Sequence, residues 1–90
     1  MDLRPEEVCD RLIGLVKQVS GSAAVFPHPF PLDTQLSELG VTSLKMVNLM
    51  LAVELEFDIA IPQPDITPEN FQSVRAIQSL VERMLSMRRH

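Results

Sequence analysis

The chain has 90 residues, 46% of them hydrophobic and 22% charged, and its formal net charge at pH 7 is −4. Because acidic side chains outnumber basic ones, the composition argues against nucleic-acid binding, which needs Lys and Arg to neutralise phosphates. The length fits one domain over residues 1–90. There is no secretory signal pattern and no apolar run of membrane-spanning length, so we expect a cytoplasmic protein.

The first predicted element is a helix over about 3–20. Pro5 fits its first turn, where the missing N–H costs nothing, and Gly21 fits its end. Five apolar residues recur at helical spacing and share one face: Val8, Leu12, Leu15, Val16 and Val19.

Cysteine and histidine are scarce. Cys9 is the one cysteine, which excludes an intrachain disulfide and a cysteine-based zinc site. It lies within the apolar pattern of the first helix, so we expect a buried, inert thiol. His28 falls in a loop and His90 at the tail, so no metal site is predicted.

Residues 21–40 lose the helical periodicity and predict a long first loop. Pro27, Pro29 and Pro31 exclude a helix, because each lacks an N–H and restricts the residue before it. A connection of this length would let the helices on either side run in the same general direction. Its apolar residues are expected to pin the loop over the core: Val25, Phe26, Phe30, Leu32, Leu36 and Leu39.

A second helix is predicted over about 42–57, with Thr42 as its N-cap. Projected at 100° per residue, it carries two apolar stripes. One stripe consists of Leu44, Val47, Leu51 and Leu55, and the other of Met46, Met50, Val53 and Phe57, with Leu49 beside it. Either the helix is central and buries both stripes, or one stripe faces outward toward a partner. Ser43 lies one turn before Val47, so the Leu44 stripe is the better candidate for the outward face.

The rest of the chain predicts an extended segment and two further helices. Residues 59–65 contain two prolines and read as extended chain. Thr67 followed by Pro68 predicts a short helix over 67–71. Ser73 would cap a last helix over about 73–86, and no pair of strands is indicated.

The ordered combination of motifs resembles the acyl carrier protein family. The chain reads Leu-Gly at 39–40, Thr-Ser-Leu at 42–44, Glu-x-x-Phe at 54–57 and Ile-Pro at 61–62. Upstream, residues 33–36 also match the segment that precedes the family's attachment motif. The resemblance covers most of the chain, and it implies an all-α four-helix bundle with a long first loop and a short third helix.

What the resemblance implies for function is a carrier that is not itself an enzyme. Ser43 matches the serine that holds 4′-phosphopantetheine covalently, and the arm's thiol bears an acyl or aminoacyl group as a thioester. A helix start suits a phosphodiester, because free N–H groups and the positive dipole end lie there. No activating base adjoins Ser43, so a phosphopantetheinyl transferase would attach the arm from coenzyme A. A dedicated acyl- or amino-acid-activating ligase and a downstream acyltransferase or synthase are the other expected partners of this monomer.

The second helix departs from the family pattern. Thr42 replaces the usual Asp before the serine, which keeps the cap and loses the charge. Lys45, Asn48 and Leu55 stand where acids are common. We therefore expect a dedicated carrier that recognises its partners through more apolar contacts. The residues expected to bind partners are Thr42, Leu44, Lys45, Val47 and Leu51. The cargo is not specified, because a fatty, polyketide or amino acid would fit the sequence.

Two other functions agree with parts of the pattern. The first is an unmodified interaction module of the same fold that docks through Leu44, Val47 and Leu51. The second is a small hydrolase with Ser43 as nucleophile, which would need a base within hydrogen-bond reach. Modification of the Ser43 hydroxyl would distinguish a carrier from an unmodified interaction module. Hydrolysis of a substrate by the unmodified protein would identify a hydrolase.

Overall fold

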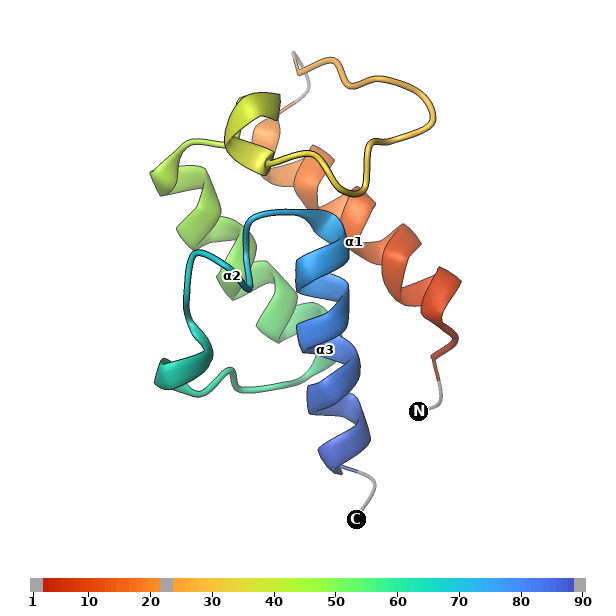
Figure 1. Cartoon of the computed structure of the whole chain (residues 1–90), viewed down its shortest axis with the longest axis vertical. Coiled ribbons are helices and arrows are strands. Elements are labelled where there is room, and N and C mark those ends of the chain that lie inside the picture. Colours follow the sequence, from red (N-terminus) through yellow and green to blue (C-terminus); the bar gives the residue numbers. More distant parts are fainter. Residues whose placement is uncertain (1–2, 22–23, 89–90) are drawn as a thin grey trace.

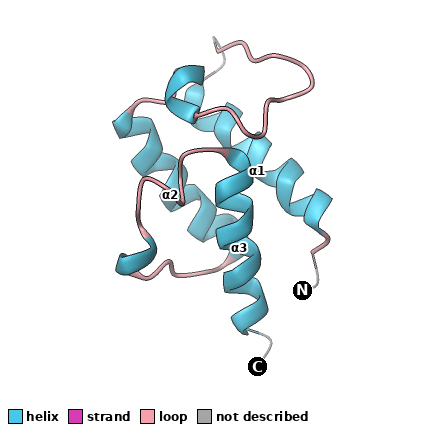
Figure 2. Ribbon diagram, in the orientation of Figure 1, coloured by secondary structure: helices cyan, strands magenta, loops and turns pink. Residues whose placement is uncertain are grey.

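The computed structural model describes residues 3–21 and 24–88. This part of the chain contains three α-helices, α1 (Pro5–Ser20), α2 (Ser43–Phe57) and α3 (Val74–Arg88), and no strand (Figures 1 and 2). Two 3-10 turns, η1 (Leu36–Leu39) and η2 (Gln63–Asp65), interrupt the connections. Helix α1 packs against both α2 and α3. None of the described helices is long and apolar enough to cross a membrane.

Helix α1 begins two residues later than predicted and ends at the predicted residue, Ser20. Pro5 occupies the first turn, and Gly21 leaves the helix at a φ of 91° while its N–H still bonds the Lys17 carbonyl at 3.2 Å. Four residues of the predicted apolar face are buried: Val8, Leu12, Leu15 and Val16. They pack in one core cluster with the apolar sides of α2 and α3.

The long first loop lies across one end of the helices and is bonded to the start of α3 (Figure 1). The backbone N–H of Leu36 donates to the Gln72 carbonyl at 2.8 Å, and that of Arg75 donates to the Leu32 carbonyl at 3.0 Å. The Arg75 guanidinium also bonds the Asp33 carboxylate at 2.6 Å. Leu36 is fully buried, whereas Val25 is 92% exposed, so the expectation that Val25 pins the loop is wrong.

The direction of the helices corrects a second expectation. Figure 1 shows α1 running toward the long loop and α2 running back from it, so these two helices are antiparallel. Helices α2 and α3 run the same way, and residues 58–73 return the chain between them. The crossover connection between two parallel helices is therefore residues 58–73, not the first loop.

The structure has three α-helices where four were expected, because residues 68–71 form only a turn. Its start matches the predicted cap, since Thr67 Oγ1 accepts the Asn70 N–H at 3.2 Å. The turn cannot continue because its next backbone groups bond elsewhere. The Gln72 carbonyl accepts from Leu36, and Ser73 caps α3 by accepting the Ala76 N–H at 3.1 Å. Phe71 is buried at this point.

The second connection is fastened to α2 by a carboxylate. Helix α2 ends at Asp58, which adopts a left-handed conformation with a φ of 53°. The Ile59 N–H donates to the Glu54 backbone carbonyl at 3.0 Å, and the Ile61 N–H donates to Glu54 Oε2 at 2.8 Å. Ile59 and Ile61 are both buried, so this bond holds the chain where it enters the core.

We expect Glu54→Ala to lower the free energy of unfolding by about 1–3 kcal/mol, because it leaves the Ile61 N–H without its acceptor. Glu54→Gln should cost less, since an amide oxygen can still accept the bond. Urea unfolding followed by circular dichroism measures both values, with Glu38→Ala, on the exposed turn η1, as the control. Equal unfolding midpoints for Glu54→Ala and the wild type would show that the bond contributes nothing.

Candidate functional site

The start of α2 is set by a glycine and a threonine. Gly40 ends η1 in the left-handed region at a φ of 91°, which L side chains adopt only with strain. Val41 is then buried and anchors the chain. The Thr42 side chain accepts the Lys45 N–H at 3.3 Å, as predicted for the N-cap, and its carbonyl accepts the Met46 N–H at 2.8 Å. These bonds place Ser43 as the first residue of the helix.

Ser43 is exposed at the N-terminus of α2. The first N–H groups of a helix have no acceptor in a preceding turn, and the helix dipole is positive at this end. An anion attached to the Ser43 hydroxyl is therefore favoured there. Of the two histidines, His28 lies in the first loop, and His90 lies outside the described residues.

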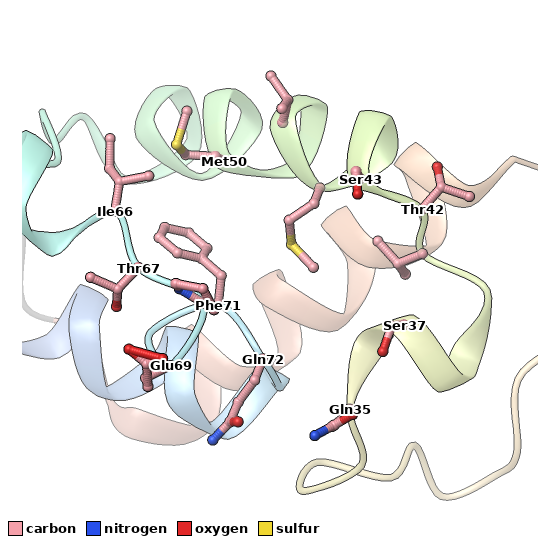
Figure 3. A pocket seen from close by; sticks show the side chains of 14 residues that line it. Gln35, Ser37, Thr42, Ser43, Met50, Ile66, Thr67, Glu69, Phe71 and Gln72 are labelled. Carbon is pink, nitrogen blue, oxygen red and sulfur yellow. The ribbon is translucent and has the colours of Figure 1, made fainter.

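A groove with a volume of about 580 Å³ opens beside Ser43. It lies between α2 on one side and η1 and the 66–72 segment on the other (Figure 3). Its apolar lining consists of Val41, Met46, Val47, Met50, Ile66, Pro68 and Phe71. Apart from Thr42 and Ser43, its main polar groups belong to Gln35, Ser37, Thr67, Glu69 and Gln72. The groove therefore offers an apolar floor and polar edges next to an exposed hydroxyl.

The two apolar stripes of α2 have different environments. On the inward side, Leu49 and Val53 are fully buried and Phe57 is 4% exposed. On the outward side, exposure is 73% for Leu44, 51% for Val47, 50% for Leu51 and 84% for Leu55. The expectation that the Leu44 stripe faces outward is confirmed, and the alternative that α2 buries both stripes is wrong. Four large apolar side chains on one helix face form an unpartnered surface in this structure.

Lys45 differs from its exposed neighbours. Its side chain is half-buried, and its ammonium donates to the Ser20 carbonyl at 3.4 Å. Ser20 is the last residue of α1, where the helix dipole attracts a cation. The positive charge is thus directed at the end of α1, and it ties the first turn of α2 to that helix.

Cys9 is half-buried rather than buried as expected. Desolvation raises the pKa of its thiol, the charge of Asp10 raises it further, and the charge of Arg75 opposes both. A raised pKa keeps the thiol protonated at neutral pH, which makes it a poor nucleophile. Within residues 3–21 and 24–88, no three His, Cys, Asp or Glu side chains lie close enough together to hold a metal ion.

These features define a helical protein that presents one serine at a capped helix start beside a groove. Residues 10–83 match the family described as the phosphopantetheine attachment site, and the chain belongs to this family. It is a carrier protein, whose cofactor is covalently attached phosphopantetheine.

The chain is 48% identical over 75 residues to aminoacyl carrier protein 1 of Bradyrhizobium diazoefficiens, a match that covers 83% of this chain and 82% of the relative. Aminoacyl carrier protein 2 of the same organism is 40% identical over 74 residues, covering 82% of each chain. Among solved structures, a complex of Bradyrhizobium japonicum glycine:carrier protein ligase with glycylated carrier protein matches with a TM-score of 0.69 and 40% identity. That match covers 86% of this chain and 96% of the other, and it establishes the carrier-protein fold.

The residues at the start of α2 fit this cofactor. When bound, phosphopantetheine supplies a thiol on which the cargo is held. The helix N-terminus favours the negative charge of a phosphodiester. The groove has an apolar floor and polar edges, which suit the alternating methylene and amide groups of the phosphopantetheine arm. Of the residues that line the groove, the sequence pointed to Thr42, Ser43 and Val47. It gave no indication that Gln35, Glu69 and Gln72 would line the same groove. No local signal could have found these three, because only the folded chain brings their segments to α2.

Proposed function

We propose that Ser43 carries the phosphopantetheine arm and that the cargo is an amino acid activated by a dedicated ligase. In this proposal residues 1–90 act as one monomeric domain in the cytoplasm and have no catalytic activity of their own. A phosphopantetheinyl transferase attaches the arm, and a downstream acyltransferase or synthase receives the cargo.

The observation that carries the proposal is the position of Ser43. It is exposed, it begins a helix that Thr42 caps, and it lies at the edge of the groove. It also falls within the region that matches the family. Ser37 and Thr42 are the other hydroxyl side chains at this end of the groove. Thr42 Oγ1 is engaged as the cap, and Ser37 lies within the 3-10 turn η1, which makes Ser43 the hydroxyl best placed for attachment.

An aminoacyl cargo is supported by the relatives and by the surface of α2. Two relatives of at least 40% identity are named aminoacyl carrier proteins. The solved complexes pair their carrier proteins with glycine:carrier protein ligase. In this chain the first turn of α2 contains no acidic residue, unlike the acidic helix expected of a general fatty-acid carrier. We infer that a ligase of the same class as that enzyme loads this protein.

We further propose that the outward face of α2 binds the partner enzymes. The contact would consist of Leu44, Val47 and Leu51, with Thr42 at its head. Lys45 borders this surface, and because its ammonium bonds Ser20, we assign it a contact through its methylene stem only. Exposed leucines in place of acids shift recognition from long-range steering toward apolar burial.

Intact mass spectrometry tests the proposal directly. The protein is incubated with coenzyme A and a broad-specificity phosphopantetheinyl transferase, and a phosphopantetheine-sized gain in mass is expected. The modified protein is then offered glycine and a panel of other amino and fatty acids with their activating ligases. Stable loading by amino acids is expected. Preferential loading by fatty acids would overturn the aminoacyl assignment, and a protein that no transferase modifies would instead be an unmodified docking module.

A further inference from the structure

The groove beside Ser43 contains a single charged side chain. Among the described residues that line it, only Glu69 is ionisable. Figure 3 shows Ser43 on α2 and Glu69 on the segment that faces it, toward opposite ends of the groove. Ser43 and Met50, which mark the α2 wall, are seven residues apart and so separated by about 10 Å along the helix. A chain attached at Ser43 and laid along this wall passes the 66–72 segment, which lines the opposite side of the groove.

Among the described residues, no ion pair or hydrogen bond within the fold explains the position of the Glu69 side chain. Its side chain is exposed, and no ion pair joins it to another part of the described chain. The other polar groups of its turn are used within the fold, since Thr67 accepts the Asn70 N–H and the Asn70 amide donates to the Asp65 carbonyl at 2.8 Å. The carboxylate is therefore available to a ligand in the groove.

The floor of the groove adds a second constraint on the cargo. Met46 and Met50 are half-buried on α2, while Leu49 on the same helix is fully buried and Phe71 opposite is 5% exposed. The core behind this wall is packed, so the groove accepts a ligand along its surface. A ligand there meets an apolar floor along its length and one negative charge near the 66–72 segment.

We propose that Glu69 is the specificity-determining residue of the groove and binds the free α-ammonium of an aminoacyl cargo. This inference rests on the proposed function. An aminoacyl thioester keeps its ammonium, which a carboxylate complements, whereas a fatty or acetyl cargo offers no charge at that point. The Glu69 carboxylate binds the α-ammonium of the cargo while the carrier is not bound to an enzyme. Because Glu69 is exposed, the contact responds to salt.

Two stable arms make the test possible. Coenzyme A analogues that end in a glycyl or an acetyl group through an amide are transferred onto the protein, and intact mass verifies each product. The amide signals of Thr67 and Glu69 and the carboxyl carbon signal of Glu69 are then compared by NMR. We expect the glycyl arm to shift these signals and the acetyl arm to leave them near their positions in the unmodified protein. The difference should largely disappear at about 1 M salt, where the screening length is about 3 Å.

Matched variants identify the residue responsible. Glu69→Gln should remove the difference between the two arms at Thr67, whereas Glu38→Gln, on the neighbouring turn η1 and outside the groove lining, should retain it. Equal shifts with glycyl and acetyl arms would overturn the inference and leave the proposed function intact. A glycyl-specific shift that persists in Glu69→Gln would also overturn it. Failure to gain either arm would overturn the proposed function and this inference with it.

Discussion

Replacing Ser43 with alanine should abolish the phosphopantetheine-sized gain in mass that we expect of the wild type after incubation with coenzyme A and a transferase. Alanine removes the hydroxyl oxygen that forms the phosphodiester, and no other side chain at the start of α2 offers an equivalent exposed hydroxyl outside the cap. The fold should survive, because alanine is the best helix former and the capping bond belongs to Thr42. Intact mass gives the modification, and circular dichroism confirms the helices.

Ser37→Ala is the matched control, since Ser37 also lines the groove but lies on η1. It should gain the arm as the wild type does. A mass gain in Ser43→Ala would place the attachment elsewhere and contradict the proposed site. If the wild type resists a generic transferase, Thr42→Asp supplies the negative charge that the family has before the serine, and it also keeps a capping side chain.

The second large effect concerns two leucines on α2. Leu49 is fully buried and Leu51, two residues on, is 50% exposed. We expect Leu49→Ala to lower the free energy of unfolding by about 2–5 kcal/mol, through lost burial and the cavity left behind. This is a large part of the roughly 5–15 kcal/mol that stabilises an ordinary domain. Leu51→Ala should change stability by only about 0.5 kcal/mol, because it lies on the surface and alanine favours helix.

Urea unfolding of the two variants measures this contrast, and each variant serves as the other's control. Similar losses for both would mean that the outward stripe belongs to a core. The folded Leu51→Ala protein then tests docking, since its phosphopantetheinylated form should be loaded more slowly by the ligase than the wild type. Loading at the wild-type rate would remove Leu51 from the proposed contact.

The main helices were predictable because their signals are local. Pro5 fits the first turn of α1 because it has no N–H to leave unpaired. Gly21, Thr42 and Ser73 mark helix ends through hydrogen bonds to residues three or four positions away. The inward side of α2 also followed from residue spacing, because the stripe that begins beside Ser43 was expected to face outward. Periodicity shows which residues share a helix face, so it predicts which face is buried. It does not show which other element packs against that face.

The failures have non-local causes. The turn at 68–71 ends next to Gln72, whose carbonyl accepts a bond from Leu36 in the distant first loop. The relative direction of α1 and α2 depends on the path of the long loop, which is bonded to the distant start of α3 through Leu32 and Leu36. The groove is the clearest case. Ser43 was found by its motif, but Glu69 joins the site only because the second connection folds back against α2.

Because Ser43 and the outward stripe lie on one helix, the proposed partner enzymes cannot all bind the protein at the same time. Ser43 and Leu51 lie eight residues apart, about 12 Å along α2. A typical enzyme interface covers about 800 Å² of each partner, whereas the whole molecule exposes 5799 Å². A patch of about 800 Å² is roughly 30 Å across, which is wider than the separation of Ser43 and Leu51, so an enzyme docked over this face covers both residues at once. If the proposed transferase, ligase and receiving enzyme all dock on this face, they must bind one at a time, and an abundant partner that releases slowly would inhibit the other two by competition alone.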